Sequence, residues 1–250
     1  MMWMLLSSIA LANPPIERVD IDINCGSVVV TVGDLQITGD VEVDRSERVR
    51  VRNGADLKCG DVRVQMPAEA RLSFESVSGH LIVTGLTGRV DFESVSGSLE
   101  VAGASQAPNE APSKVNAQTV SGNLKIHVGS GADVDAAAVS GNIAVCGGPV
   151  ARLEASTVSG RVELSVSTTV DSRIEGVAHS GRLSLAMDRE PGRLRAETFA
   201  GNIENKLTGD RPVPGFAGSR LEVDHDRGPS VELETFAGHI RLQTLTEECP

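Results

Sequence analysis

The stretch FESVSGHLIVTG, residues 74–85, is followed by a near copy, FESVSGSLEVAG, at residues 92–103. Weaker copies continue to the end of the chain, and each contains a Gly at the same place. The repeat glycines are Gly79, Gly97, Gly122, Gly141, Gly160, Gly181, Gly201 and Gly238, with spacings of 18, 25, 19, 19, 21, 20 and 37 residues. Self-similarity at a period of about twenty residues indicates a repeat architecture.

Apolar residues recur at fixed distances from each repeat Gly. They stand two and four residues after it, as at Leu99 and Val101, which predicts a buried strand face with a period of two. They also stand seven and five residues before it, as at Val90 and Phe92. Two residues before it the chain has Val77, Val95, Val120, Val139, Val158, His179, Phe199 and Phe236. This even offset predicts a bend or bulge near the preceding Ser or Thr, with these side chains also directed inward.

One such unit cannot bury its own inner face. Stacking the units in chain order places each apolar position over its copy about 4.8 Å away, which predicts an all-β protein, a β-solenoid with rungs of about 18–21 residues. An antiparallel sandwich is the alternative, since it also has strands every 8 to 12 residues. The sandwich does not require the same residue type at the same offset in every unit, so the pattern favours the solenoid.

The N-terminal third follows the same frame more loosely, around Gly26 and Gly60. We therefore predict one continuous domain over residues 13–250. The spacing stretches near residues 105–113 and 208–219, where the sequence is polar and rich in Pro, and these segments are predicted to be loop insertions.

The N-terminus reads MMWMLLSSIALANPP and ends an apolar run with Ala-Leu-Ala before Asn13, which is typical of a signal peptide over residues 1–12. The run is shorter than the roughly 20 residues that span a bilayer, and no later segment is apolar enough, so we expect no transmembrane segment. The protein is predicted to be exported, to the periplasm, the outer surface or the extracellular space. No Lys or Arg precedes the run, and a misassigned start or a buried N-terminal strand is the alternative.

Charge limits the partners. The 250-residue chain has a formal net charge of −11 and a sequence pI of about 4.9. Nucleic-acid binding depends on Lys and Arg that displace counterions from phosphates. We therefore expect no nucleic acid and no anionic membrane surface as partner.

Several of these segments resemble the bacterial putative-adhesin family of β-strand-repeat domains. The resemblance lies in the units ESVSGSLEV, QTVSGNLKI and STVSGRVEL, in the Met-Pro of VRVQMPAEARLSFESVSG, and in the closing SRLEVDHDRGPSVELETFAGHIRL, and it covers residues 16–245. It implies a right-handed single-stranded β-helix in an exported bacterial protein. The family has no known catalytic residues to transfer, and its function is largely unassigned.

No residue pattern points to catalysis. Ser precedes six of the repeat glycines, but six equivalent serines cannot each have an activating base and an orienting acid, so they are interpreted as turn and ladder hydroxyls. The five His are scattered without zinc-ligand spacing. Glu75 and Glu93 are expected to be splayed and solvated near Arg71 and Arg89. We predict no catalytic, cofactor-binding or metal-binding residues.

Two cysteines share one position of the repeat. Cys25 and Cys59 directly precede Gly26 and Gly60, where later repeats have Ser. If the intervening residues form one rung, the two Cα atoms lie about 4.8 Å apart, within the range of about 4.4 to 6.8 Å for a disulfide. If Gly39 closes a further rung between them, the distance doubles and no bond forms. We predict the disulfide.

The other two cysteines are expected to be unpaired. Cys146 follows Gly141, several rungs before the end of the stack, and the tail that carries Cys249 is short after Leu242.

The prediction for function is an exported, non-enzymatic, adhesin-like protein that binds or scaffolds at the cell surface or envelope, with an unknown protein or cell-surface partner. The alternative is a carbohydrate-active β-helix enzyme, a polysaccharide lyase or hydrolase. Such an enzyme needs aromatic side chains for sugar rings, whereas this chain has no Tyr, five Phe at mostly inward positions and one Trp inside the predicted signal peptide. A long groove with converging charged residues would favour the enzyme, and flat ladders of Ser, Asn and Glu would favour the scaffold. The sequence does not specify the oligomeric state.

Overall fold

The computed structural model describes residues 16–45, 48–53, 59–102, 111–215, 218–225 and 227–246. Within these residues the chain forms seventeen β-strands and no helix, so the all-β prediction is confirmed. Accordingly, no described helix is long and apolar enough to cross a membrane. The predicted signal peptide, residues 1–12, lies outside the described residues.

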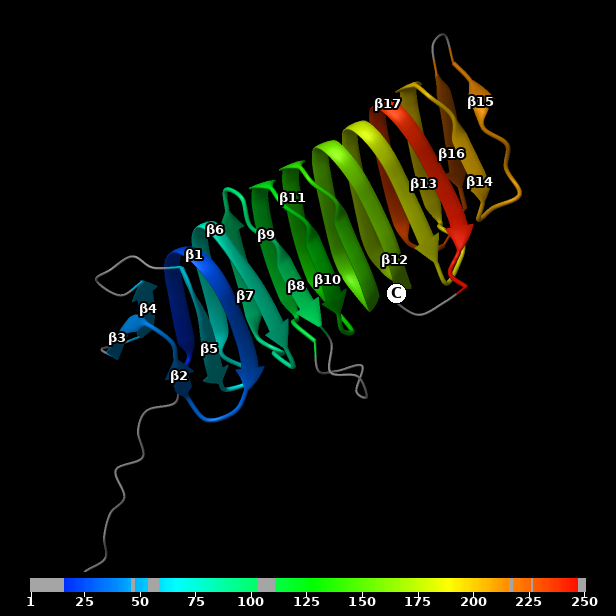
Figure 1. Ribbon diagram of the computed structural model, residues 1–250. Helices are drawn as coiled ribbons and strands as arrows, with labels where there is room; N and C mark the ends of the chain where they lie inside the picture. The colour runs from blue at the N-terminus through cyan, green and yellow to red at the C-terminus, as the bar shows by residue number, and fades with distance from the viewer. Residues whose placement is uncertain are drawn as a thin grey trace, which may run out of the picture.

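The strands build one elongated stack (Figure 1). The first eight are β1 (Arg18–Val32), β2 (Gln36–Thr38), β3 (Val41–Arg45), β4 (Val49–Asn53), β5 (Gly60–Met66), β6 (Arg71–Thr84), β7 (Arg89–Ser94) and β8 (Leu99–Ala102). The others are β9 (Lys114–Ser121), β10 (Leu124–Val128), β11 (Asp133–Ser140), β12 (Ile143–Met187), β13 (Arg193–Ala200), β14 (Ile203–Lys206), β15 (Val213–Pro214), β16 (Ser219–Asp224) and β17 (Ser230–Thr244). Each layer of the stack contains one repeat, and we call this layer a rung.

In the centre of the stack, over residues 71–187, consecutive repeats form consecutive rungs. β6 pairs in parallel with β7 and β8, these pair with β9 and β10, and those pair with β11 and β12. Equivalent residues lie opposite one another, for example Phe74 and Phe92, or Leu81 and Leu99. The period of the sequence is therefore the period of the stack.

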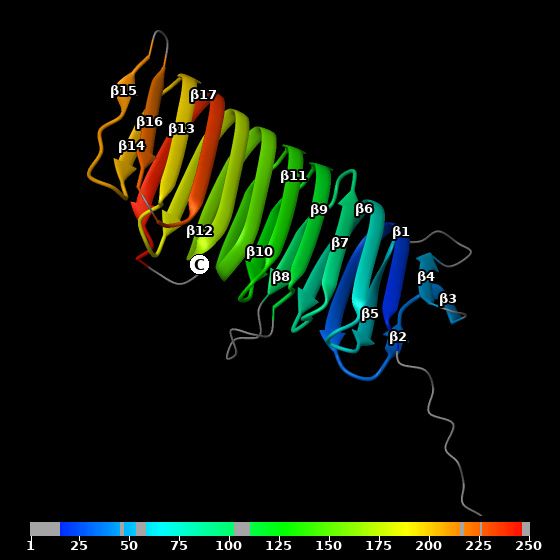
Figure 2. The same ribbon diagram turned by 180° about the vertical axis from the view of Figure 1, so that it is seen from behind.

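At both ends the order of the rungs departs from the order of the chain. β17 pairs in parallel with the last part of β12 on one side and with β13 and β14 on the other. β1 likewise lies between β6 on one side and β4 and β5 on the other. In Figures 1 and 2 the red β17 therefore does not form the edge of the stack, which is orange. The expected stacking in chain order is wrong at these two places.

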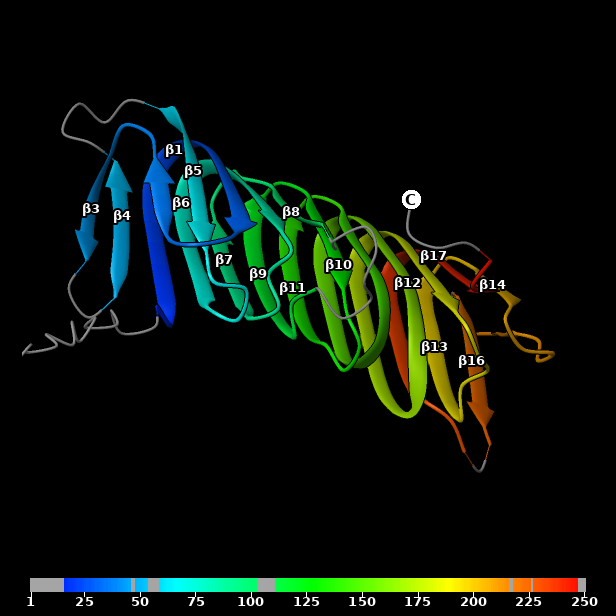
Figure 3. The ribbon, with the colours of Figure 1, turned by 90° about the horizontal axis from the view of Figure 1, so that it is seen from below.

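Short antiparallel strands close the two edges. β16 pairs with β13 and β15 with β16, while at the opposite end β3 pairs with β4 and β2 with β5 (Figure 3). Gly39 lies in the turn between β2 and β3 and closes no rung. An open parallel edge offers unpaired backbone groups to other chains, and short strands that run the other way reduce this risk.

The core is a continuous apolar column inside the stack. Leu72, Phe74, Leu81 and Val83 have no exposed surface, and the equivalent residues of the neighbouring rungs are buried as well. The predicted inward positions two and four residues after the repeat Gly, and seven and five before it, are thus correct.

The prediction for the position two residues before the Gly is wrong. Val77, Val95, Val120, Val139 and Val158 are 48% to 55% exposed. We call these five side chains the valine column.

The inward position is three residues before the Gly, where the chain has Ser, Thr or Ala. Ser94, Thr119 and Thr157 are buried there. Thr119 Oγ1 donates a hydrogen bond of 3.2 Å to the carbonyl oxygen of Gly97 in the neighbouring rung. A side chain of this size fits inside the bend, and the next two residues both face outward.

Candidate functional site

The repeat glycines form a column in which neighbouring backbones are too close for a side chain. A Cβ atom on Gly141 would lie 1.8 Å from the carbonyl oxygen of Gly122, and one on Gly181 would lie 1.8 Å from that of Gly160. At the first rung, by contrast, a Cβ on Gly60 would have no atom within 4 Å. The glycines are therefore a packing requirement of the stack, and their position is not by itself a binding site.

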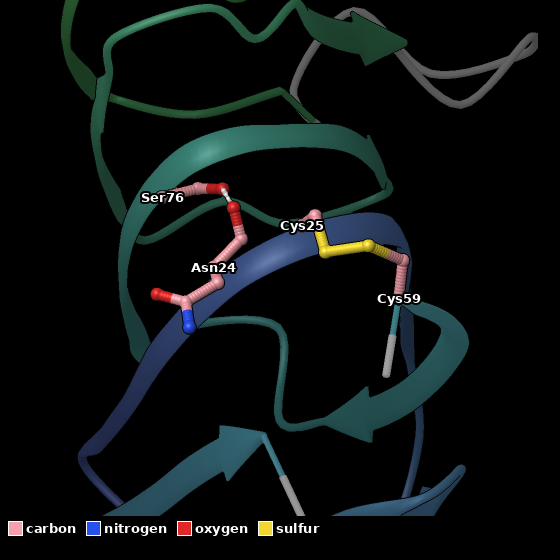
Figure 4. Close-up of a disulfide and its surroundings, with 4 residues drawn as sticks. All are labelled: Asn24, Cys25, Cys59 and Ser76. Atoms are coloured by element: carbon pink, nitrogen blue, oxygen red, sulfur yellow. Dashed lines mark hydrogen bonds between the residues drawn. A yellow bond between two sulfur atoms is a disulfide. The ribbon is translucent and has the colours of Figure 1, made fainter. Parts of the chain in front are cut away.

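Cys25 and Cys59 link the first two rungs. Their Cα atoms are 4.9 Å apart, and the two side chains form a disulfide (Figure 4). This spacing follows from the direct pairing of Gly26 with Gly60. Beside the bond, the hydroxyl of Ser76 in the adjacent rung donates to a backbone oxygen of β1 at 3.4 Å.

Cys146 is disulfide-bonded, so the prediction that it stays unpaired is wrong. The prediction relied on chain order, which places the C-terminal strand too far away. In the structure β17 lies directly beside the end of β12, and Leu245 N donates to Met187 O at 2.7 Å. Met187 is two rungs from Cys146, about 10 Å. Cys249, the other cysteine of that prediction, lies outside the described residues.

The six serines before the repeat glycines are all on the exposed side of the bend: Ser78, Ser96, Ser121, Ser140, Ser159 and Ser180. On the other side of the Gly, Asn123 Oδ1 accepts a hydrogen bond from Asn142 N, and Asn142 Oδ1 accepts one from Arg161 N, both at 3.1 Å. The hydrogen bonds of these asparagines connect one rung to the next, so they stabilise the stack.

One charged cluster lies on the face formed by β6, β7 and β9. The Asp91 carboxylate is bound by Arg71 at 2.7 Å, by Arg89 at 2.7 Å and by the Asn116 amide at 3.0 Å. Arg71 and Arg89, which the sequence placed near the two stacked glutamates, therefore pair with Asp91 instead. In the described part of the chain, no three His, Cys, Asp or Glu side chains are placed to hold a metal ion.

A shallow groove of about 670 Å³ runs along the stack, from the rung of Gly26 to that of Gly160. The valine column forms one wall. The residues four before each Gly form the other wall, and the small residues between them form the floor. The second wall consists of Asp22, Glu75, Glu93, Gln118, Ala137 and Ser156.

The two ends of this groove differ in charge. Asp22, Glu75 and Glu93 occupy adjacent rungs at one end, whereas the other end has neutral residues. No Lys, Arg or His is among the described residues that line the groove, and none of the three carboxylates forms a salt bridge within the described ranges. The groove is therefore apolar on one side and acidic at one end.

Beyond the groove the same column becomes aromatic. His179 stacks on Phe236 with ring centroids 5.1 Å apart, and Phe236 stacks on Phe199 at 5.0 Å. Phe199 is 58% exposed and Phe236 50%, so the expectation that the Phe residues lie mostly inward holds for Phe74 and Phe92 but not for these two. Phe236 has a stacking partner on each of its two faces, whereas Phe199 stacks on Phe236 alone.

No protein-family model matches the chain, and no curated protein matches it. Among solved structures, it is similar to a protein from Bacteroides fragilis described as a putative adhesin, with 15% identity, 92% of this chain and 93% of that chain covered, and a TM-score of 0.49. It is also similar to a putative cell adhesion protein from Clostridium sporogenes, with 9% identity, the same coverage of 92% and 93%, and a TM-score of 0.22.

Sequence reasoning identified the residues of the groove but not the groove. It noted Glu75 and Glu93, and it assigned the valine column to the interior because apolar side chains are usually buried. One signal was available. The residue three before each Gly is small at every repeat, which is what the inside of a tight bend requires.

Proposed function

We propose that the chain is an exported, non-enzymatic, adhesin-like protein that binds a partner at the cell surface or envelope through the groove. In this proposal residues 13–250 are a single domain, a right-handed single-stranded β-helix with loops near residues 105–113 and 208–219. The exposed valine column is the observation that supports binding most.

Single exposed apolar residues are normal on protein surfaces, whereas contiguous apolar rows mark interaction sites. The valine column is such a row, because equivalent residues of neighbouring rungs are in register and each member is about half exposed. Other outward columns of the same stack have Ser, Asn, Arg or Glu. A rigid stack of parallel strands also holds the row straight, which suits recognition of an elongated partner.

Export is supported by the cysteines. Disulfides persist in oxidising compartments and are rare in the cytosol. The bond between Cys25 and Cys59, together with the disulfide-bonded state of Cys146, fits a protein that leaves the cytosol after synthesis.

The carbohydrate-active alternative has less support. A glycosidase keeps one carboxyl group protonated, usually by burial, while its partner stays ionised. Glu75 and Glu93 are both exposed on the wall of a shallow groove, without a buried acid beside them. The stacked rings of Phe199 and Phe236 have no free face between them for a sugar.

The test is capture from an envelope fraction with matched variants. The chain from residue 13 onward is immobilised as wild type, as Val120→Asp with Val139→Asp, and as the control Val170→Asp, whose side chain is 55% exposed outside the groove. Mass spectrometry should identify proteins that the wild type and the control retain and the groove variant loses. The same captured set with all three chains would contradict the groove as the binding site.

A further inference from the structure

We propose that the occupant of the groove is a cationic amphipathic helix of a partner protein. Its apolar stripe contacts the valine column, and its Lys or Arg residues lie over the acidic end. This inference depends on the proposed function, because it specifies the partner class of the same groove. It is carried by three features of the groove: its charge, its repeat distance and its width.

The charge favours a cationic partner. Asp22, Glu75 and Glu93 project from adjacent rungs without a salt bridge among the described residues, and carboxylates about 5 Å apart repel one another. The nearby guanidinium groups of Arg71 and Arg89 are bound to Asp91. Arg52 lies opposite Asp22 in the neighbouring strand β4, so Glu75 and Glu93 are the two carboxylates over which a cationic side chain of a partner is expected to lie. The net charge of −11 would also steer a cationic partner toward this chain.

The repeat distance favours a helix over an extended strand. Equivalent Cα atoms in adjacent rungs lie 4.9 Å apart at the first pair of rungs. A helix repeats one face every 5.4 Å, whereas a strand repeats one face about every 6.8 Å. Over the four steps from Val77 to Val158 a helix drifts out of register by about 2 Å and a strand by about 8 Å. A helix of about 13 residues covers this length of about 20 Å.

The width fits a single row of side chains. The groove crosses five rung steps, about 24 Å, and its two walls stand two residues apart along each rung, which is at most about 7 Å. A whole helix is about 10 to 12 Å across and does not fit inside. The helix instead lies over the groove and inserts the stripe formed by its positions i, i+3, i+4 and i+7.

Binding is tested with three fluorescein-labelled peptides of 18 residues. The first has Leu along one helical stripe, Lys at the polar positions of one half and Gln at those of the other. The second replaces Lys with Glu, and the third has the composition of the first with Leu at alternate positions. Fluorescence anisotropy at low salt should show saturable binding of the first peptide, at least about tenfold weaker binding of the other two, and loss of affinity as salt is raised.

Variants of the protein locate the peptide. The double substitution Glu75→Lys with Glu93→Lys should lower the affinity for the basic peptide at least about tenfold. The substitution Glu190→Lys, at an exposed residue outside the groove, should leave that affinity unchanged. Val120→Thr with Val139→Thr, which keeps side-chain shape, should also weaken it, and the matched control is Val170→Thr. Circular dichroism of each variant checks that the strands are intact.

Four outcomes would overturn the helix proposal: equal binding of the acidic peptide, tighter binding of the alternating peptide, no effect of the glutamate variants, or a wild-type dimer that the valine variant dissociates in light scattering. The last would mean that a second copy occupies the groove. If envelope capture depends on the valine column while the basic peptide does not bind, the proposed function stands and only the partner class is wrong. If neither the envelope capture nor the binding of the basic peptide depends on the valine column, both proposals fail.

Discussion

The centre and the ends of the stack obey the same pairing rules but differ in how the chain connects them. Over residues 71–187 each rung is followed by the next repeat of the chain. At the ends, β1 and β17 lie one rung inward, between segments distant in sequence. Since every repeat has the same columns, in-register pairing does not depend on which repeat is the neighbour. Side-chain size and chain connection must then decide the order.

Column size explains the position of β17. Leu233 lies opposite Gly176 of β12 on one side and opposite Ala196 of β13 on the other. The Leu233 side chain comes within 3.0 Å of where a Cβ of Gly176 would lie, so it occupies the space that the glycine leaves. In chain order Gly176 and Ala196 would be neighbours, and the Leu233 side chain would not fill the space beside Gly176. A large residue between two small ones fills the column at native density.

The largest expected effect is therefore loss of β17. A chain that ends at Gly228 lacks Val231, Leu233, Ile240 and Leu242, each at most 1% exposed. At about 1.5 to 3 kcal/mol for each buried side chain, the loss of about 6 to 12 kcal/mol is comparable with the whole stability of a domain. We expect no cooperative thermal unfolding by circular dichroism, whereas a control that ends at Thr246 should unfold cooperatively. A cooperative transition of the shorter chain near the temperature of the control would show that β17 does not hold the end together.

The second prediction concerns the opposite end, where a disulfide secures the inserted strand. Replacing Cys25 and Cys59 with Ser removes a bond that closes a sequence separation of 34 residues. Loop-closure entropy for such a length corresponds to about 3 to 4 kcal/mol. Denaturant unfolding should show a free energy of unfolding that is lower by this amount. The wild type in reductant should lose the same contribution at this end of the stack. Non-reduced peptide mapping checks the pair directly, and free thiols at both positions would contradict it.

Much of the centre could be predicted from the sequence, because equivalent positions of successive repeats lie opposite one another and so define the register. The columns at Leu81 and Val83, and at Leu72 and Phe74, are buried where the period of two placed them. The groove was missed because Val95 and its equivalents are apolar yet half exposed. Hydrophobicity alone cannot indicate which side of a bend a residue faces, whereas residue size three positions before the Gly can.

The ends could not be predicted because the repeats are interchangeable in register. Nothing in the segment SVELETFAGHI indicates whether it follows the repeat of Gly201 or precedes it in space. The alternation of Gly176, Leu233 and Ala196 distinguishes the two orders. Stacking in chain order likewise places the C-terminal strand too far from Cys146.

The third prediction contrasts an interior rung with the edge rung in the same column. Gly141→Ala places a Cβ 1.8 Å from a backbone oxygen that cannot move aside alone, so the rungs must separate locally. We expect a loss of about 2 to 3 kcal/mol in the free energy of unfolding. Gly60→Ala meets no atom within 4 Å and should be neutral, or stabilising by up to about 1 kcal/mol because the unfolded chain is less flexible. Equal effects of the two substitutions in denaturant unfolding would refute the close-packing explanation of the repeat Gly.

The smallest effect is expected at the out-of-order contact between β14 and β17. There the Lys206 ammonium at 2.7 Å and the Arg241 guanidinium at 3.0 Å hydrogen-bond to Glu204 and lower the pKa of its carboxyl group. A lowered folded-state pKa stabilises the fold above the unfolded value of about 4.3, and this contribution is lost as the pH falls through the folded-state pKa. Since these side chains are substantially exposed, the effect is small and screened by salt.

Glu204→Gln should accordingly lower the melting temperature slightly at pH 7 and low salt, with a difference from wild type that disappears in acid. The matched control, Glu190→Gln, changes an exposed carboxylate that lies outside the strands, and it should leave the melting temperature at pH 7 and low salt unchanged. A difference between Glu204→Gln and wild type that stays constant from pH 7 into acid would mean that the side chain acts through packing. In that case charge would contribute nothing at this junction, and the position of β17 would rest on the fit of Leu233 between Gly176 and Ala196 alone.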